Sequence, residues 1–233
     1  MNARSVVAVL SGDLVKSRRL KDDRSAVLDG VAQAIKITRS FLAAKHSKFL
    51  YSGFYRGDSF QCALSEPKHA LWTALFLRAE LKKLRRRDIR VDVRIGLGLG
   101  AFSTWNERDI SASDGEAFQL SGKALDSLKS AKEKYRRLRI HTPWPDADVI
   151  FSILASFLDA VSQRWTLEQS EAISLSLINK TQEEISRALK VQQPAVQMRL
   201  QTAGYYAVKE ALDYFGRTVD DRIIEKGPYN RPL

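Results

Sequence analysis

Two aspartates, Asp13 and Asp58, stand where strand-like apolar segments end or turn. Asp13 lies in SGDLVKSR at 11–18, and Asp58 lies in YRGDSFQCAL at 55–64. Two carboxylates brought together at strand ends form a hard oxygen site suited to Mg²⁺ or Mn²⁺, and such ions commonly serve phosphate chemistry. Aspartate is also a frequent structural turn residue. The pair therefore predicts a divalent-metal site for a phosphate-bearing ligand, with two structural turns as the alternative.

The residues after Asp13 could cradle phosphate oxygens through their backbone N–H groups and two basic side chains. These candidates are Leu14, Val15, Lys16, Ser17 and Arg18. The sequence offers few residues for other kinds of catalytic or metal site. Three scattered histidines and the single Cys62 do not favour a zinc site or a catalytic triad. We therefore interpret Cys62 as a small core residue.

Composition is that of a globular protein with a basic first part. The chain has 233 residues, of which 44% are hydrophobic, and a net charge of +11. Residues 1–150 hold 28 Lys and Arg against 17 Asp and Glu, whereas residues 151–233 hold 10 of each. A basic part suggests polyanionic partners, although a solvated basic surface explains the charge equally well. The lone cysteine and the absence of a long apolar run predict a cytoplasmic protein with no membrane partner.

Hydrophobic periodicity predicts the elements that position these residues. A fold of class α+β is expected, with a ferredoxin-like domain at 1–143 and a small all-α domain at 149–226, separated by a linker at 143–148. In this fold the first strand lies beside a central hairpin, so that Asp13 could face Asp58. The strand expected at 89–99 carries glycines on one face, which let a ligand or another backbone approach closely. The predicted elements are strands at 5–10, 49–56, 59–64, 89–99 and 138–141, and helices at 24–44, 67–86, 115–130 and 149–160, followed by three helices between 166 and about 215.

The segment from Thr181 to Val208 has the pattern of a helix-turn-helix. Thr181 and Glu184 form a capping-box pair, and Pro194 suits the first turn of a second helix. Glutamines on that helix could read adenine, and basic side chains could contact phosphates. The zero net charge after residue 150 argues for weak DNA binding, and a bundle that packs on the first domain or mediates dimerisation is the alternative. The candidate DNA contacts are Arg187, Lys190, Gln192, Gln193, Gln197 and Arg199.

Several of these segments resemble class III nucleotide cyclases, which share their core fold with GGDEF diguanylate cyclases. SGDLVKSR and RGDSFQCAL resemble the two segments that carry the metal aspartates of that family. VDVRIGLGLG resembles the following glycine-rich strand, and SDGEAFQLSGKALDSL resembles the late helix that reaches across a dimer interface. The whole arrangement, with its helical tail, resembles the SatD family of bacterial proteins. The segment from Thr181 resembles the helix-turn-helix of sigma-factor-like regulators.

The resemblance implies roles for individual residues. Asp13 and Asp58 would be metal ligands, and Glu116 would read the base. Gln119 stands where active cyclases keep an asparagine, and Lys123 stands where they keep an arginine. Lysine offers a point charge in place of a planar fork, so the transition-state apparatus is altered.

The sequence thus predicts a homodimeric, nucleotide-binding, cyclase-like regulator that uses Mg²⁺ or Mn²⁺ and binds DNA through its helix-turn-helix. Two alternatives remain open at this stage. One is an active metal-dependent nucleotidyl cyclase that makes a cyclic nucleotide from a nucleoside triphosphate. The other is a ligand-free interaction domain.

Overall fold

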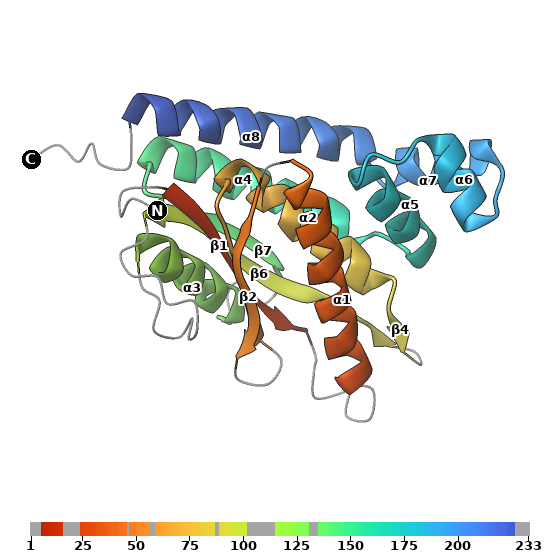
Figure 1. Ribbon diagram of the computed structural model, residues 1–233, viewed down its shortest axis with the longest axis horizontal. Coiled ribbons are helices and arrows are strands. Elements are labelled where there is room, and N and C mark those ends of the chain that lie inside the picture. The colour runs from red at the N-terminus through yellow and green to blue at the C-terminus, as the bar shows by residue number, and fades with distance from the viewer. Residues whose placement is uncertain are drawn as a thin grey trace, which may run out of the picture.

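The computed structural model describes residues 6–15, 24–45, 47–55, 59–86, 89–101, 115–130 and 135–226. It has the expected α+β composition, with one mixed sheet and many helices (Figure 1). The strands are β1 (Val6–Leu14), β2 (Phe49–Tyr55), β3 (Ser59–Leu64), β4 (Arg85–Arg86), β5 (Ile89–Arg90), β6 (Val93–Ala101) and β7 (Leu138–His141). The helices are α1 (Arg24–Ala43), the 3₁₀ helix η2 (Pro67–His69), α2 (Ala70–Lys82), α3 (Glu116–Lys129), α4 (Pro145–Gln163), α5 (Leu167–Leu177), α6 (Gln182–Leu189), α7 (Gln193–Thr202) and α8 (Tyr205–Lys226).

The main sheet has the strand order β2-β3-β1-β6-β7. β1 pairs antiparallel with both β3 and β6, β2 pairs antiparallel with β3, and β7 runs parallel to β6. β1 therefore lies at the centre of the sheet and is buried along most of its length. This burial explains why it reads as a continuous apolar run without alternation.

The strand predicted at 89–99 is divided in the structure. Ile89–Arg90 pairs with Arg85–Arg86 as a separate two-stranded sheet, and the long strand begins only at Val93. Asp92 stands at the division, where its carboxylate accepts hydrogen bonds from the Val93 N–H and from Arg78. The Asp92 carbonyl still accepts a hydrogen bond from the Val15 N–H, next to the last β1–β6 pair. The predicted register of alternating core residues still holds from Val93 onward.

Successive residues of β1 face two different layers of helices. Val6, Ala8 and Leu10 belong to the large core formed with α1, α2 and α4. Val7 and Val9 face the opposite layer, where they pack with Ala117 of α3. Figure 1 shows α3 on one side of the sheet, with α1 and α2 on the other. The sheet is thus the middle of three layers over its central strands.

The helical tail continues the large core. Buried side chains of α5, α6, α7 and α8 belong to the same apolar cluster as those of the sheet-covering helices. The Trp72 indole N–H donates to the Leu177 carbonyl at 3.0 Å, and the rings of Phe151 and Phe215 lie 4.7 Å apart. The tail therefore packs on the first part of the chain, as one of the two alternatives predicted. None of the described helices is long and apolar enough to cross a membrane.

Two predicted boundaries are corrected. The proline-rich segment 143–148 was expected to be a linker, but Trp144 stands at the N-cap position of α4 and Pro145 occupies its first turn, where a missing N–H costs nothing. The region from 166 to 215 was expected to hold three helices, and it holds α5, α6, α7 and the first half of α8. Gly204, with φ of +70°, separates α7 from α8 because this left-handed conformation suits glycine.

Candidate functional site

Asp13 lies near the end of the central strand and is paired with two cations. Its Cα is opposite Arg94 on β6 and opposite Ser59 on β3. Its carboxylate oxygen Oδ2 lies 3.3 Å from Arg94 Nη1 and 3.9 Å from Lys129 Nζ, at the end of α3. The Asp13 side chain is only 15% exposed, so its negative charge is held in place by these neighbours.

The other predicted metal ligand, Asp58, lies outside the described residues, as do Lys16, Ser17 and Arg18. However, Ser59 directly follows Asp58 and is the Cα partner of Asp13. The neighbouring face of β1 and β3 is also polar. Gln61 donates to the Ser11 hydroxyl at 3.0 Å, and the Ser11 and Ser121 hydroxyls lie 3.0 Å apart.

The described residues fit a divalent cation only as part of a ligand set. Over these residues, no group of three or more His, Cys, Asp or Glu side chains could hold a metal ion. Asp13 contributes one carboxylate, and the guanidinium of Arg94 already neutralises it. A metal at this position needs Asp58 as a second carboxylate. In the predicted phosphate cradle, Leu14 and Val15 are buried, and the Val15 N–H donates to the Asp92 carbonyl at 2.9 Å. That amide is therefore used within the chain.

The glycines of β6 accommodate a helix. A Cβ atom on Gly96 would lie 2.3 Å from the Leu125 backbone nitrogen, and one on Gly98 would lie 2.3 Å from the Ala117 carbonyl oxygen. Such distances are well inside van der Waals contact, so side chains here would push α3 away from the sheet. The sequence left open whether a ligand or another backbone approaches this strand. In the structure it is the backbone of α3.

The three candidates on α3 do not meet Asp13 within one chain. Glu116, in the first turn, accepts a hydrogen bond from the Ala101 N–H at 3.4 Å. Gln119 and Lys123 lie on the exposed face of the same helix. Lys129, which contacts Asp13, is at the other end, so Glu116 and Asp13 are separated by about 20 Å at a rise of about 1.5 Å per residue.

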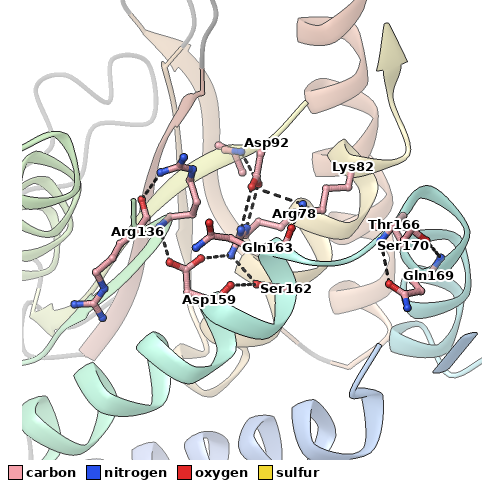
Figure 2. Close-up of polar contacts among 12 residues, drawn as sticks. Arg78, Lys82, Asp92, Arg136, Asp159, Ser162, Gln163, Thr166, Gln169 and Ser170 are labelled. Atoms are coloured by element: carbon pink, nitrogen blue, oxygen red, sulfur yellow. Dashed lines mark hydrogen bonds and ion pairs between the residues drawn. The ribbon is translucent and has the colours of Figure 1, made fainter. Parts of the chain in front are cut away.

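Within the described residues, a cluster of buried charges lies elsewhere, around the fully buried Arg78 (Figure 2). Its guanidinium donates to both oxygens of Asp92 at 3.2 and 3.1 Å, to Asp159 at 2.8 Å and to the Ser162 hydroxyl at 2.7 Å. The cluster joins α2, the start of β6 and α4. Because Arg78 has no exposed surface, we assign the cluster a structural role.

The pKa values in this cluster follow from burial and charge. Burial would raise the pKa of Asp92, but the charges of Arg78 and Lys82 outweigh it and hold that pKa below its ordinary value. Burial would likewise lower the pKa of Arg78, and the two carboxylates raise it instead. Sequence reasoning missed this cluster. The available signal was a single arginine within the apolar stretch of α2 (ALWTALFLRAELK).

The predicted DNA-contacting residues lie on two helices joined by a tight turn. α6 ends at Leu189, the following Lys190 turns the chain with a φ of 53°, and α7 begins at Gln193. Ile185, Val196 and Leu200 are buried, as predicted, and both capping boxes, at Thr166 and Thr181, are present. The exposed candidates are Arg187, Lys190, Gln192, Gln193 and Gln197.

Arg199 differs from the expectation that it faces outward. It is half-buried, and its Nη1 lies 3.5 Å from Glu171 Oε2 on α5. This ion pair ties α7 to α5 and neutralises a charge that was expected to contact phosphate. The other basic candidate on these helices with an ion pair, Arg187, is exposed and contacts Glu183 at 3.6 Å.

Comparison with known proteins supports one of the predicted resemblances directly. The sequence model of the SatD family matches residues 6–211. The chain belongs to the SatD family. The match begins at β1 and extends into α8, so the SatD family includes both the sheet and the helical tail.

Among solved structures, a bacterial light-regulated adenylyl cyclase is similar to this SatD-family chain, with 16% identity and a TM-score of 0.40. The similarity covers 58% of this chain and 42% of that cyclase, so it is a weak likeness over part of each molecule. No curated protein matched the sequence.

Proposed function

We propose that this SatD-family protein binds a nucleotide through a divalent cation held by Asp13 and Asp58, in a ferredoxin-like sheet of the nucleotide-cyclase type. The strand register carries the proposal, because the residue that follows Asp58 is the direct partner of Asp13. The element order supports it as well. A strand, a helix, a hairpin, a second helix and a fourth strand form an antiparallel sheet in which β1 lies between β3 and β6.

The basic side chains at Asp13 suit a phosphate ligand. Arg94 and Lys129 both lie within 4 Å of the Asp13 carboxylate and are partly exposed, at 20% and 42%. A bound cation would supply neutralisation of phosphate charge. The two side chains would exchange a carboxylate partner for phosphate oxygens, which arginine can bind bidentately.

A homodimer is part of the proposal. Glu116 stands at the end of α3 remote from Asp13, where its carboxylate accepts a hydrogen bond from the Ala101 N–H. Gln119 and Lys123 are exposed. We infer that a second copy would bring its α3 to the nucleotide held at Asp13, which is how the resemblance places these residues.

The test measures Mn²⁺ binding by electron paramagnetic resonance and nucleoside triphosphate binding by calorimetry. Asp58→Asn and Asp13→Asn should each weaken Mn²⁺ binding at least tenfold, whereas Asp29→Asn, on the exposed face of α1, should leave it unchanged. Arg94→Gln should strengthen Mn²⁺ binding, because it removes a competing cation 3.3 Å from the carboxylate. Mn²⁺ binding that is equal in all four variants would show that Asp13 serves only its ion pair.

The enzyme alternative is separated by product analysis. Each of the four ribonucleoside triphosphates is incubated with Mn²⁺ and the protein, and products are resolved by chromatography. A cyclic or linked product that disappears in Asp13→Asn would make the protein a cyclase. Binding without product would agree with the altered residues Gln119 and Lys123 and with a regulatory role.

We also propose that α6 and α7 form a DNA-binding helix-turn-helix. The supporting observation is the division of α7 into a buried side, with Val196 and Leu200, and an exposed side that carries Gln193 and Gln197. Glutamine side chains on a helix that enters the major groove can bond adenine bidentately. The protein has only modest positive charge here, so dimerisation would add the second half-site.

Fluorescence anisotropy with a labelled 30-base-pair DNA duplex of random sequence, measured over a range of salt, tests this surface. Lys190→Ala should lower the slope of log K against log salt by about one, the value for one phosphate contact. Arg164→Ala, an exposed cation at the end of α4, is the matched control and should leave the slope unchanged. Equal slopes in wild type and Lys190→Ala would remove α6–α7 from the DNA interface.

A further inference from the structure

A cavity of about 320 Å³ lies at the end of the sheet opposite to Asp13. It is open to solvent on one side and is lined by the end of α1, by η2, by the first turn of α2, by the end of α5 and by α8 between Tyr205 and Asp220. Because η2 follows β3, and Leu64 of β3 pairs with Ala8 of β1, this end is where β1 begins. The cavity thus joins the layer that covers the sheet to α8, the long helix along one side of the molecule in Figure 1.

One part of the lining is apolar and rigid. Trp72 stacks between Phe41 and Phe76, with ring centroids 4.7 and 5.1 Å away. The polar groups of the aromatic residues are used inside the protein, since the Trp72 N–H donates to the Leu177 carbonyl and the Tyr205 hydroxyl donates to the Ser176 carbonyl. Their carbon surfaces, together with Leu212, remain to line the cavity.

The polar part of the lining has an excess of positive charge. The lining contains Lys45, Lys68, Lys209 and Arg217, against Asp213 and Asp220. Among the described residues, Lys68 is the lining cation that a carboxylate neutralises directly, with Asp220 at 3.1 Å. Within the described part of the chain, Lys45, Lys209 and Arg217 have no carboxylate in ion-pair distance.

The remaining groups do not cancel this excess. Lys45 Nζ lies over the Phe41 ring at 5.1 Å from its centroid, and Arg217 Nε donates to the Asp213 carbonyl oxygen at 3.3 Å. His69 does not change the net charge of the lining. Burial, followed by the charges of Lys68 and Lys45, lowers its pKa, so its ring is neutral at pH 7.

We propose that this cavity binds a small organic anion that has an apolar ring body and a carboxylate, sulfonate or phosphate group. The ring body would rest on Phe41, Trp72 and Leu212, and the anionic group would meet Lys209 and Arg217 at the mouth. The volume falls in the usual range for small-molecule sites. Because the ligand would touch both η2 and α8, its binding would hold the helical tail against the first part of the chain.

The proposal does not depend on the nucleotide site. Asp13 lies at the opposite end of β1, and none of the cavity residues belongs to the candidate metal site. Substitutions in the cavity should therefore leave Mn²⁺ binding unchanged, and Asp13→Asn should leave anion binding unchanged.

The test compares two probes of the same shape by isothermal titration calorimetry. Naphthalene-1-sulfonate carries the anionic group, and naphthalene-1-sulfonamide is its neutral counterpart. The sulfonate should bind the full-length protein at least tenfold more tightly than the sulfonamide and should raise the thermal midpoint of unfolding. Equal affinities, or no binding of the sulfonate at millimolar concentration, would overturn the proposal.

Two double variants locate the binding. Lys209→Gln with Arg217→Gln removes two exposed cations of the cavity and should weaken sulfonate binding about tenfold. Lys36→Gln with Arg164→Gln is the matched control, since it removes one cation from each of two other surface cavities of the described chain. A control that loses as much affinity as the cavity variant would show that the sulfonate binds elsewhere, and would overturn the assignment.

Discussion

Replacing Arg78 by methionine should destabilise the protein more than any other single charge removal in the described chain. The guanidinium is fully buried and donates four hydrogen bonds, three of them shorter than 3.2 Å, to Asp92, Asp159 and Ser162. Methionine fills a similar volume but leaves two buried carboxylates without their main cation. The perturbation therefore isolates charge from packing.

The size of the destabilisation depends on the interaction partners that the Asp92 and Asp159 carboxylates retain in the variant. Asp92 retains Lys82 at 3.7 Å and the Val93 N–H at 2.8 Å, and Asp159 retains the Arg137 N–H at 2.7 Å. Removal of one member of a buried ion pair costs about 3–5 kcal/mol. With these remaining partners, we expect a loss of about 4 kcal/mol, which is a large part of the roughly 5–15 kcal/mol that stabilises a typical domain.

The assay is urea unfolding followed by circular dichroism. The matched control is Lys83→Met, which removes the partly exposed pair between Lys83 and Glu80 and should cost less than about 1 kcal/mol. If Arg78→Met lowered the unfolding free energy no more than this control, the buried network would stabilise the protein no more than a partly exposed ion pair, and the reasoning would be refuted.

The pH dependence of the unfolding free energy gives a second test of the Arg78 cluster. In the wild type the pKa of Asp92 is below its ordinary value, so its stabilising contribution is complete above about pH 4 and is lost as pH falls further. In Arg78→Met, burial should outweigh Lys82 alone and raise the pKa of Asp92 in the folded state. The difference in unfolding free energy between the wild type and Arg78→Met should therefore shrink as pH is lowered from 7 towards 4.5. Over this range Asp92 stays ionised in the wild type, so its contribution to wild-type stability does not change.

Three further outcomes are expected. Gly98→Ala should destabilise the protein by about 3 kcal/mol in urea unfolding because its Cβ would meet α3 backbone at 2.3 Å, whereas Gly122→Ala, with open space around it, should stabilise it by about 0.5–1 kcal/mol. The Cys62 thiol is buried, which raises its pKa to about 12, so iodoacetamide should label it only as fast as the protein opens, with the rate rising in urea. The hydrogen bond from Lys180 leads the interactions that lower the pKa of Glu184 to about 2, so the capping contribution to α6 should be present above pH 4.5 and should fade towards pH 2 in amide exchange.

Local signals predicted much of the fold correctly. The capping boxes at Thr166 and Thr181 mark true helix starts, and residues 6–10 of the buried strand predicted at 5–10 lie in β1. These signals depend on residues close together in the sequence. The break at Asp92, whose carboxylate accepts hydrogen bonds from the distant Arg78, could not be read from the alternating pattern around it.

Long-range partners explain the errors at the candidate sites. Arg199 appeared outward-facing from its helical position, but Glu171 on another helix holds it against α5. The Arg78 cluster combines residues up to 84 positions apart. No local pattern indicates such pairings, because they arise only when the sheet, α2 and α4 pack together.

The explanation of the glycines changes what supports nucleotide binding. Glycines in a strand can admit a ligand or a helix, and at Gly96 and Gly98 the nearest atoms belong to the backbone of α3. That strand therefore argues for close helix packing and is neutral on ligand binding. The case then depends on Asp13, on the register that sets Ser59 opposite it, and on two cations at its carboxylate. Since Arg94 is both the competitor of a metal and a potential phosphate contact, Arg94→Gln distinguishes these roles: tighter Mn²⁺ binding with weaker triphosphate binding is the combination that only a metal–nucleotide site produces.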